Sequence, residues 1–161
     1  MNENQTNKED SRGISWSGII ALVLAFFGVV LSFWGALVTT ISQAQIPKAP
    51  LWPLPGLVLI DWVLFTLIGF IIAYLCFRRA STKWLRLAWI FTGMLIPLII
   101  FGAFSIGMAV LIVFLLFMVS TIIFAIRQSG KLLESFGLLM LGSICNLGIL
   151  LVILTLFNQS Y

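Results

Sequence analysis

Hydrophobic residues along this chain are gathered into long runs that short polar segments separate. The runs cover residues 14–42, 56–77, 87–126 and 135–157. An α-helix needs about 20 apolar residues to cross a hydrocarbon layer about 30 Å thick, and every run reaches that length. The pattern therefore predicts membrane-spanning α-helices.

The third run is too long for one span. At 1.5 Å per residue, a single helix over 87–126 would be about 60 Å long, twice the thickness it has to cross. A break is available in the segment FGAFSIG, where Gly102, Ser105 and Gly107 suit a tight turn. We therefore expect five helices. The predicted spans are residues 14–42, 56–77, 87–104, 107–126 and 135–157.

The basic residues give an independent test of this count. With five spans and a cytoplasmic N-terminus, eight of the nine Lys and Arg residues lie inside and only Lys48 lies outside. If the third run were one span, Arg127 and Lys131 would move outside and the ratio would fall to six against three. Basic loops favour the cytoplasmic side. The sequence thus predicts a disordered cytoplasmic tail over 1–13, an inside N-terminus, an outside C-terminus and a short external tail over 158–161.

Composition agrees with a membrane protein and assigns a role to the positive charge. The chain is 61% hydrophobic and 9% charged, with a mean hydropathy of +1.18, whereas a soluble domain has about 25% charged residues. The net charge of +4 comes from short segments between apolar runs, which is typical of a topology signal and not of a nucleic-acid surface. We expect an all-α membrane protein, a compact bundle of five transmembrane helices in a lipid bilayer. Its general character resembles that of small bacterial membrane proteins, so we expect a multi-pass protein of the bacterial plasma membrane.

Aromatic residues are expected to mark the two membrane interfaces. On this topology Trp16, Trp84 and Trp89 lie near the inner interface, and Trp52 and Tyr161 near the outer one. Amphipathic rings prefer that depth.

The segment RRASTKWLR, residues 78–86, is read as a cytoplasmic loop. Its basic residues Arg78, Arg79, Lys83 and Arg86 are candidates for contact with anionic lipid headgroups. The alternative is that they are the ordinary product of topology selection.

A stripe of small residues follows one side of the first span. Its spacing alternates between three and four residues, as in the seam of a left-handed helix pair. The seam consists of Gly18, Ala21, Ala25, Gly28, Ser32, Gly35, Thr39 and Ser42. Small residues let helices approach closely in lipid, where hydrophobic attraction between helices is weak. The seam predicts tight packing, either against another helix of this chain or against a second copy or a larger membrane complex.

The fifth span is the candidate partner for that seam within the chain. Gly142, Cys145, Asn146 and Gly148 cluster near its middle. An amide at that depth costs a few kcal/mol unless it has a partner, so Asn146 is expected to face protein or water. It serves either as a helix-to-helix hydrogen bond or as a contact for a polar substrate.

Two other spans carry residues that interrupt the apolar pattern. Asp61 lies about one turn inside the second span, near the outer interface. It is either a cation or proton site or a shallow, hydrated residue that favours the start of its helix. In the third span, Pro97 presses on the carbonyl of Gly93, which predicts a packing kink or a gate hinge.

The chain lacks the residue sets that catalysis requires. It has no histidine, and its hydroxyls therefore lack the base that would activate them. Beyond the tail its only carboxylates are Asp61 and Glu134, which the topology separates onto opposite faces. The two cysteines, Cys76 and Cys145, show no metal or redox spacing. We expect no enzymatic activity, no cofactor and no metal.

Prolines are concentrated between the first two spans, in QIPKAPLWPLPG. Pro47, Pro50 and Pro53 recur every three residues, the repeat of a polyproline II helix. We expect a stiff strap along the outer interface, with Trp52 anchored among headgroups and Pro55 in the first turn of the next helix.

Two functional hypotheses remain open. The first is a non-enzymatic accessory or assembly subunit that acts through helix contacts, as a homo-oligomer or in a larger complex. The second is a small transporter or channel subunit with a polar path through Asp61 and Asn146. A wet cavity lined by these two residues with Thr66 and Thr92 would favour transport, and a dry interior with bonded polar groups would favour the structural role.

Overall fold

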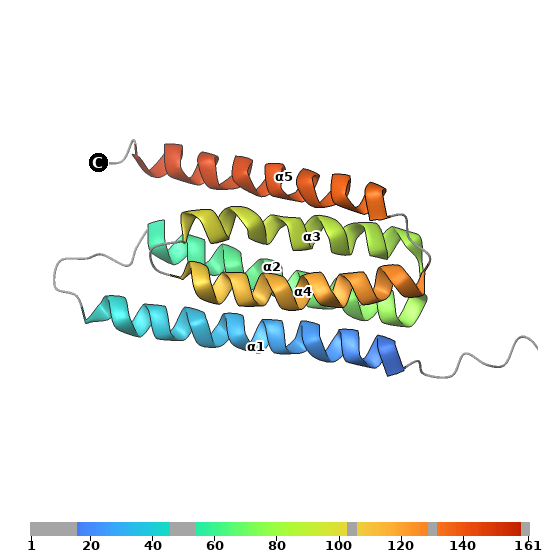
Figure 1. Ribbon diagram of the computed structural model, residues 1–161. Coiled ribbons are helices and arrows are strands. Elements are labelled where there is room, and N and C mark those ends of the chain that lie inside the picture. The colour runs from blue at the N-terminus through green and yellow to red at the C-terminus, as the bar shows by residue number, and fades with distance from the viewer. Residues whose placement is uncertain (1–15, 46–53, 103–105, 129–131, 159–161) are drawn as a thin grey trace, which may run out of the picture.

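The computed structural model describes residues 16–45, 54–102, 106–128 and 132–158. Five α-helices run side by side along one common direction (Figure 1). They are α1 (Trp16–Ala44), α2 (Leu54–Arg79), α3 (Thr82–Phe101), α4 (Gly107–Arg127) and α5 (Leu132–Asn158). All five are long and apolar enough to cross a membrane. The predicted compact helical bundle is confirmed.

The third apolar run forms two helices, as predicted. α3 ends at Phe101 and α4 begins at Gly107. In the turn the Gly107 amide donates to the carbonyl of Gly102 across 2.6 Å. A Cβ at Gly102 would lie 2.8 Å from the carbonyl oxygen of Leu98, so a larger residue would not fit this turn without a shift.

The helices are not arranged in simple chain order. α1 packs mainly on α4 and next on α2, whereas α5 packs mainly on α3. α1 and α5 therefore lie on opposite sides of the bundle, with α2, α3 and α4 between them (Figure 1). The expectation that α5 is the partner of the α1 seam is wrong, because α4 occupies that position.

The connection between α2 and α3 is much shorter than predicted. It consists of Ala80 and Ser81 alone, and Lys83 and Arg86 already belong to α3. Ala80 adopts a φ of 43°, the left-handed conformation that commonly ends a helix, and its amide donates to the carbonyl of Cys76 across 3.1 Å. The prediction of a loop over 78–86 is wrong, because apolar helices extend into polar flanking residues.

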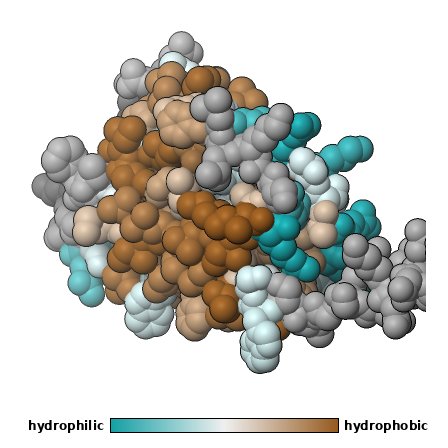
Figure 2. Space-filling view, turned by 45° about the vertical axis from the view of Figure 1, so that its right-hand side comes forward, coloured by the Kyte–Doolittle hydropathy of each residue, from teal (hydrophilic) through white to brown (hydrophobic). Residues whose placement is uncertain are grey.

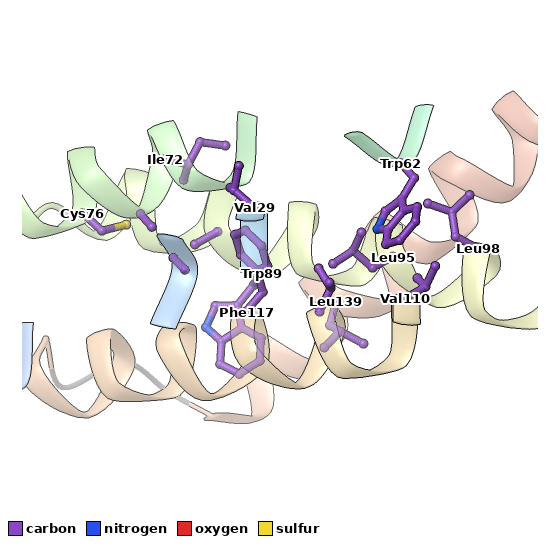
Figure 3. Close-up of a cluster of buried hydrophobic side chains, with 14 of the residues drawn as sticks. Val29, Trp62, Ile72, Cys76, Trp89, Leu95, Leu98, Val110, Phe117 and Leu139 are labelled. Carbon is purple, nitrogen blue, oxygen red and sulfur yellow. The ribbon is translucent and has the colours of Figure 1, made fainter. Parts of the chain in front are cut away.

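The core is built from large side chains between the helices. Trp62, Trp89 and Phe117 lie within it (Figure 3), as does Phe124. Trp89 is only 4% exposed. It packs inside the bundle and is not the interface marker that the sequence predicts, whereas Trp16 is 80% exposed.

Candidate functional site

The small-residue seam of α1 faces the inside of the bundle. Gly18, Ala21, Ala25, Gly28 and Ser32 are buried. The seam opens toward its C-terminal end, where Gly35 and Thr39 are half-buried and Ser42 is exposed.

Aromatic rings from the neighbouring helices fill the space that the seam leaves. A Cβ at Gly28 would lie 2.8 Å from the ring of Phe117, and one at Gly35 would lie 2.6 Å from the ring of Trp62. The ring of Phe117 also packs against Gly69 of α2, where a Cβ would lie 3.0 Å away. Phe117 is thus held between glycines of α1 and α2.

A hydrogen bond adds a specific link along this interface. The hydroxyl of Ser120 on α4 donates to the carbonyl of Ala21 across 2.8 Å. The described part of the seam is therefore used within the chain over most of its length.

At the described glycines, the tightest contacts with the backbone of another helix lie where α3 crosses α5. A Cβ at Gly93 would overlap the carbonyl oxygen of Leu139, and one at Gly142 would overlap that of Ile90. In both cases the carbonyl carbon would be only 2.8 Å away. These two glycines are reciprocal, because each receives the backbone of the other helix. Sequence reasoning assigned them to a kink and to a polar cluster, and missed this contact.

Asn146 lies at the same crossing and is fully buried. Its Nδ2 donates to the carbonyl of Met94 on α3 across 2.5 Å. Met94 lies in the turn of α3 before Pro97, which has no amide proton for the carbonyl of Gly93, the residue next to Met94. A side chain from a neighbouring helix commonly bonds the backbone at such a turn. The expected helix-to-helix bond of Asn146 is present.

Asp61 and Asn146 come together at the junction of α2, α3 and α5. The Asp61 carboxyl interacts with the Asn146 side chain. Among the described residues, Oδ2 of Asp61 and Oδ1 of Asn146 are buried without a hydrogen-bond partner. The sequence identified both residues but separated them in depth, whereas the structure brings them into one polar pair.

The threonines proposed for a polar path are bonded within the bundle. Thr66 donates to the carbonyl of Val63 in its own helix across 2.9 Å. Thr92 donates to the carbonyl of Ala88 across 2.8 Å, and its hydroxyl lies 3.2 Å from that of Thr121 on α4. The hydroxyl of Thr92 thus links α3 to α4, whereas that of Thr66 is bonded within α2.

Two hollows open on the surface of the bundle. One, of about 460 Å³, is apolar and lies between α1 and α2, beside Phe33, Leu37 and Ile60. The other, of about 670 Å³, lies at the turn between α2 and α3. Neither is lined by Asp61 or Asn146.

The second hollow gathers three of the four predicted headgroup residues. It is lined by Arg78, Arg79, Ser81, Lys83, Trp84 and Leu87. Figure 2 shows most of the hydrophilic side chains at the right-hand side of the view, beside a broad apolar surface. We call the end that carries Arg78, Arg79, Lys83 and Arg127 the basic end.

The fourth predicted residue is engaged elsewhere. Arg86 Nη2 lies 2.7 Å from Oε1 of Glu134, in the first turn of α5. Both side chains are about half exposed. Arg86 therefore pairs with α5 and does not line the hollow.

The outward face of α5 has open space beside its glycines. α5 is the least buried of the five helices. A Cβ at Gly137 or at Gly148 would meet nothing within 4 Å. Cys145 is exposed on this helix, whereas Cys76 of α2 is buried.

Some predicted features lie outside the described residues. Residues 46–53 of the predicted proline strap, with its anchor Trp52, are among them, as are the two chain ends. Within the described ranges, no three His, Cys, Asp or Glu side chains gather into a set that could hold a metal ion.

Comparison with protein-family models, with curated proteins and with solved structures finds no match to this chain.

Proposed function

We propose that this chain is a non-enzymatic accessory or assembly subunit of a membrane, acting through contacts between helices. In this proposal the bundle spans a bacterial plasma membrane with its N-terminus and its basic end in the cytoplasm and its C-terminus outside. The concentration of Lys and Arg at one end supports this orientation, because basic segments favour the cytoplasmic side.

The observation that carries the proposal is the bonding of the polar interior. Ser120, Thr92 and Asn146 each link one helix to another. Such bonds fix the register of helices in lipid. A bundle whose interior is held together in this way is suited to presenting a surface more than to conducting a solute.

The outward face of α5 is the surface that we assign to a partner. At 100° per residue, three small residues, Gly137, Gly148 and Thr155, fall on one line along α5, with Ile144 between them. Gly142 lies on the opposite side of α5 and packs on Ile90. Small residues at a lipid-facing surface allow a second helix to approach closely. The face of α1 that points away from the bundle offers no such line, since it carries Phe26, Phe33 and Trp34.

The polar pair supports a second candidate function. An ionised carboxylate at membrane depth is unfavourable unless a proton, a cation or a hydrogen-bond donor compensates it. Oδ2 of Asp61 is buried and lacks such a donor among the described residues. This oxygen is the specific observation that favours a small transporter or channel subunit.

Two experiments distinguish the two functions. The protein is extracted from its native membrane in mild detergent, and native mass spectrometry measures the masses that co-purify. The accessory role predicts an assembly larger than one chain, and a bare monomer would contradict it. In liposomes, Asp61→Asn is compared with wild type for proton and cation movement. A loss of movement in Asp61→Asn would favour the transporter, and equal movement would remove it.

A further inference from the structure

The hollow at the turn between α2 and α3 holds a cluster of charge that nothing in the bundle neutralises among the described residues. We propose that it binds the phosphate group of an anionic membrane lipid. The site consists of Arg78 and Arg79 from the end of α2, and Ser81 and Lys83 from the start of α3. This inference depends on the membrane location of the helices and not on the accessory role.

The short turn brings the two basic helix ends together. α2 ends at Arg79 and α3 begins at Thr82, with two residues between them. The left-handed Ala80 reverses the chain within that distance. Because the connection is so short, two arginines and a lysine line one hollow of about 670 Å³. Arginine and lysine are the side chains that proteins use to hold phosphate.

The start of α3 adds uncharged donors to the same place. Ser81 is the N-cap residue, and its side chain makes no capping hydrogen bond to α3. The first amides of a helix have no acceptor within it, and the helix dipole favours an anion there. Ser81 lines the same hollow as the basic side chains, at the end of α3 whose dipole favours an anion.

The walls of the hollow favour a lipid over a free anion. Trp84 and Leu87 line it beside the basic residues. Tryptophan prefers the depth of the headgroups, and a broad apolar surface lies beside the hydrophilic side chains (Figure 2). A lipid whose phosphate is held among the basic groups would thus have its acyl chains directed along an apolar surface.

Glu134 engages Arg86, which leaves three basic residues in the site. It pairs with Arg86 across 2.7 Å. Arg127 belongs to the same end of the bundle but lies over Gly18 of α1, outside the hollow. Arg127 is therefore a matched control, with the same charge at the same end and no part in the site.

Native mass spectrometry of the full chain in detergent tests the site. Phosphatidylglycerol is titrated against wild type and against Arg78→Gln, Arg79→Gln and Lys83→Gln, with phosphatidylcholine as the zwitterionic lipid. Each replacement in the hollow is expected to weaken phosphatidylglycerol binding about fivefold, the scale for one basic residue near an anionic surface. Arg127→Gln is expected to change it less than about twofold, because its charge lies outside the hollow.

Three outcomes would overturn the proposal. One is equal phosphatidylglycerol affinity in wild type and in the three hollow variants. Another is an equal loss in Arg127→Gln, which would indicate general attraction to the basic end. The third is inorganic phosphate binding as tightly as phosphatidylglycerol, which would assign the hollow to a soluble anion. Helical content from circular dichroism confirms that each variant is folded.

Discussion

The α1 seam and the crossing of α3 with α5 both use small residues, but for different purposes. Along the seam, Gly28 and Gly35 make room for the rings of Phe117 and Trp62. At the crossing, Gly93 and Gly142 make room for the backbone of the opposite helix. The glycines of the α1 seam form sockets, that is, spaces that accept aromatic side chains. The glycines of the α3–α5 crossing instead allow contact between two helix backbones.

The difference predicts how each interface responds to added volume. An aromatic ring can shift or change its rotamer when a methyl group arrives, at a moderate cost. A helix carbonyl cannot move without moving its helix. The conspicuous stripe of eight small residues is therefore expected to be more tolerant than the isolated glycines of α3 and α5.

The largest effect is expected at the crossing. Gly142→Ala introduces a Cβ that overlaps the carbonyl of Ile90, so α3 and α5 have to separate. We expect a loss of about 3 kcal/mol or more in the free energy of unfolding, at the upper end of overpacking costs. SDS titration in mixed micelles, followed by circular dichroism, measures it.

Gly148→Ala is the matched control for that experiment. It makes the same change six residues further along α5, where a Cβ meets nothing within 4 Å. We expect no loss, and a gain of up to about 1 kcal/mol from the higher helix propensity of alanine. Equal losses in the two variants would show that backbone contact is not the cause.

A moderate effect is expected on the seam. Gly28→Ala introduces a Cβ 2.8 Å from the ring of Phe117, which Gly69 confines on its other side. We expect a loss of about 2 kcal/mol, within the usual range for overpacking.

The double variant Gly28→Ala with Phe117→Leu tests whether that ring is responsible. A smaller side chain should accommodate the new methyl group, so the two changes together should cost about 1 kcal/mol less than the sum of the single losses. Strict additivity in this double-mutant cycle would contradict the socket description.

Much of the bundle follows from hydropathy and periodicity alone. The length of the third run required its division, and the seam spacing identified the buried face of α1. Periodicity tells which face of a helix is buried but not what lies against it, so α4 could not be chosen over α5. The contact of Gly93 with α5 depends on two helices crossing at one level, and neither glycine belongs to a stripe.

For the polar residues too, the sequence predicted which residues matter but not which residues they contact. Asp61 and Asn146 stand out in the sequence as polar residues inside apolar runs. Their positions within those runs, however, predicted different depths in the membrane. Their pairing depends on how α2, α3 and α5 are offset along their axes, which packing determines. The loop over 78–86 was overestimated because Lys83 and Arg86 extend α3 beyond its apolar run.

A smaller effect is expected at the polar link of the same crossing. Asn146→Leu keeps a similar volume and removes both the bond to the carbonyl of Met94 and the interaction with Asp61. Hydrogen bonds between membrane helices average below about 1 kcal/mol, so we expect a loss of that size in the same SDS titration. A loss as large as that of Gly142→Ala would instead make the amide the main determinant of the crossing.

The smallest effect is expected at the surface of that interface. Glu134→Gln breaks the ion pair with Arg86, in which both side chains are about half exposed. Exposed ion pairs contribute about 0.5 kcal/mol or less and are screened by salt. Unfolding at low and at high salt checks this, and the difference between variant and wild type should vanish at high salt.

The central claim is that the seam of α1 is used inside the chain and that the outward face of α5 meets the partner. Crosslinking in native membrane tests it most directly. A thiol-specific photocrosslinker is attached to exposed Cys145, while buried Cys76 stays unlabelled. The control carries Cys145→Ser with Leu37→Cys, at a position of α1 that is 57% exposed. We predict adducts heavier than one chain from Cys145 and few from the control. Adducts from Leu37→Cys with none from Cys145 would contradict the account.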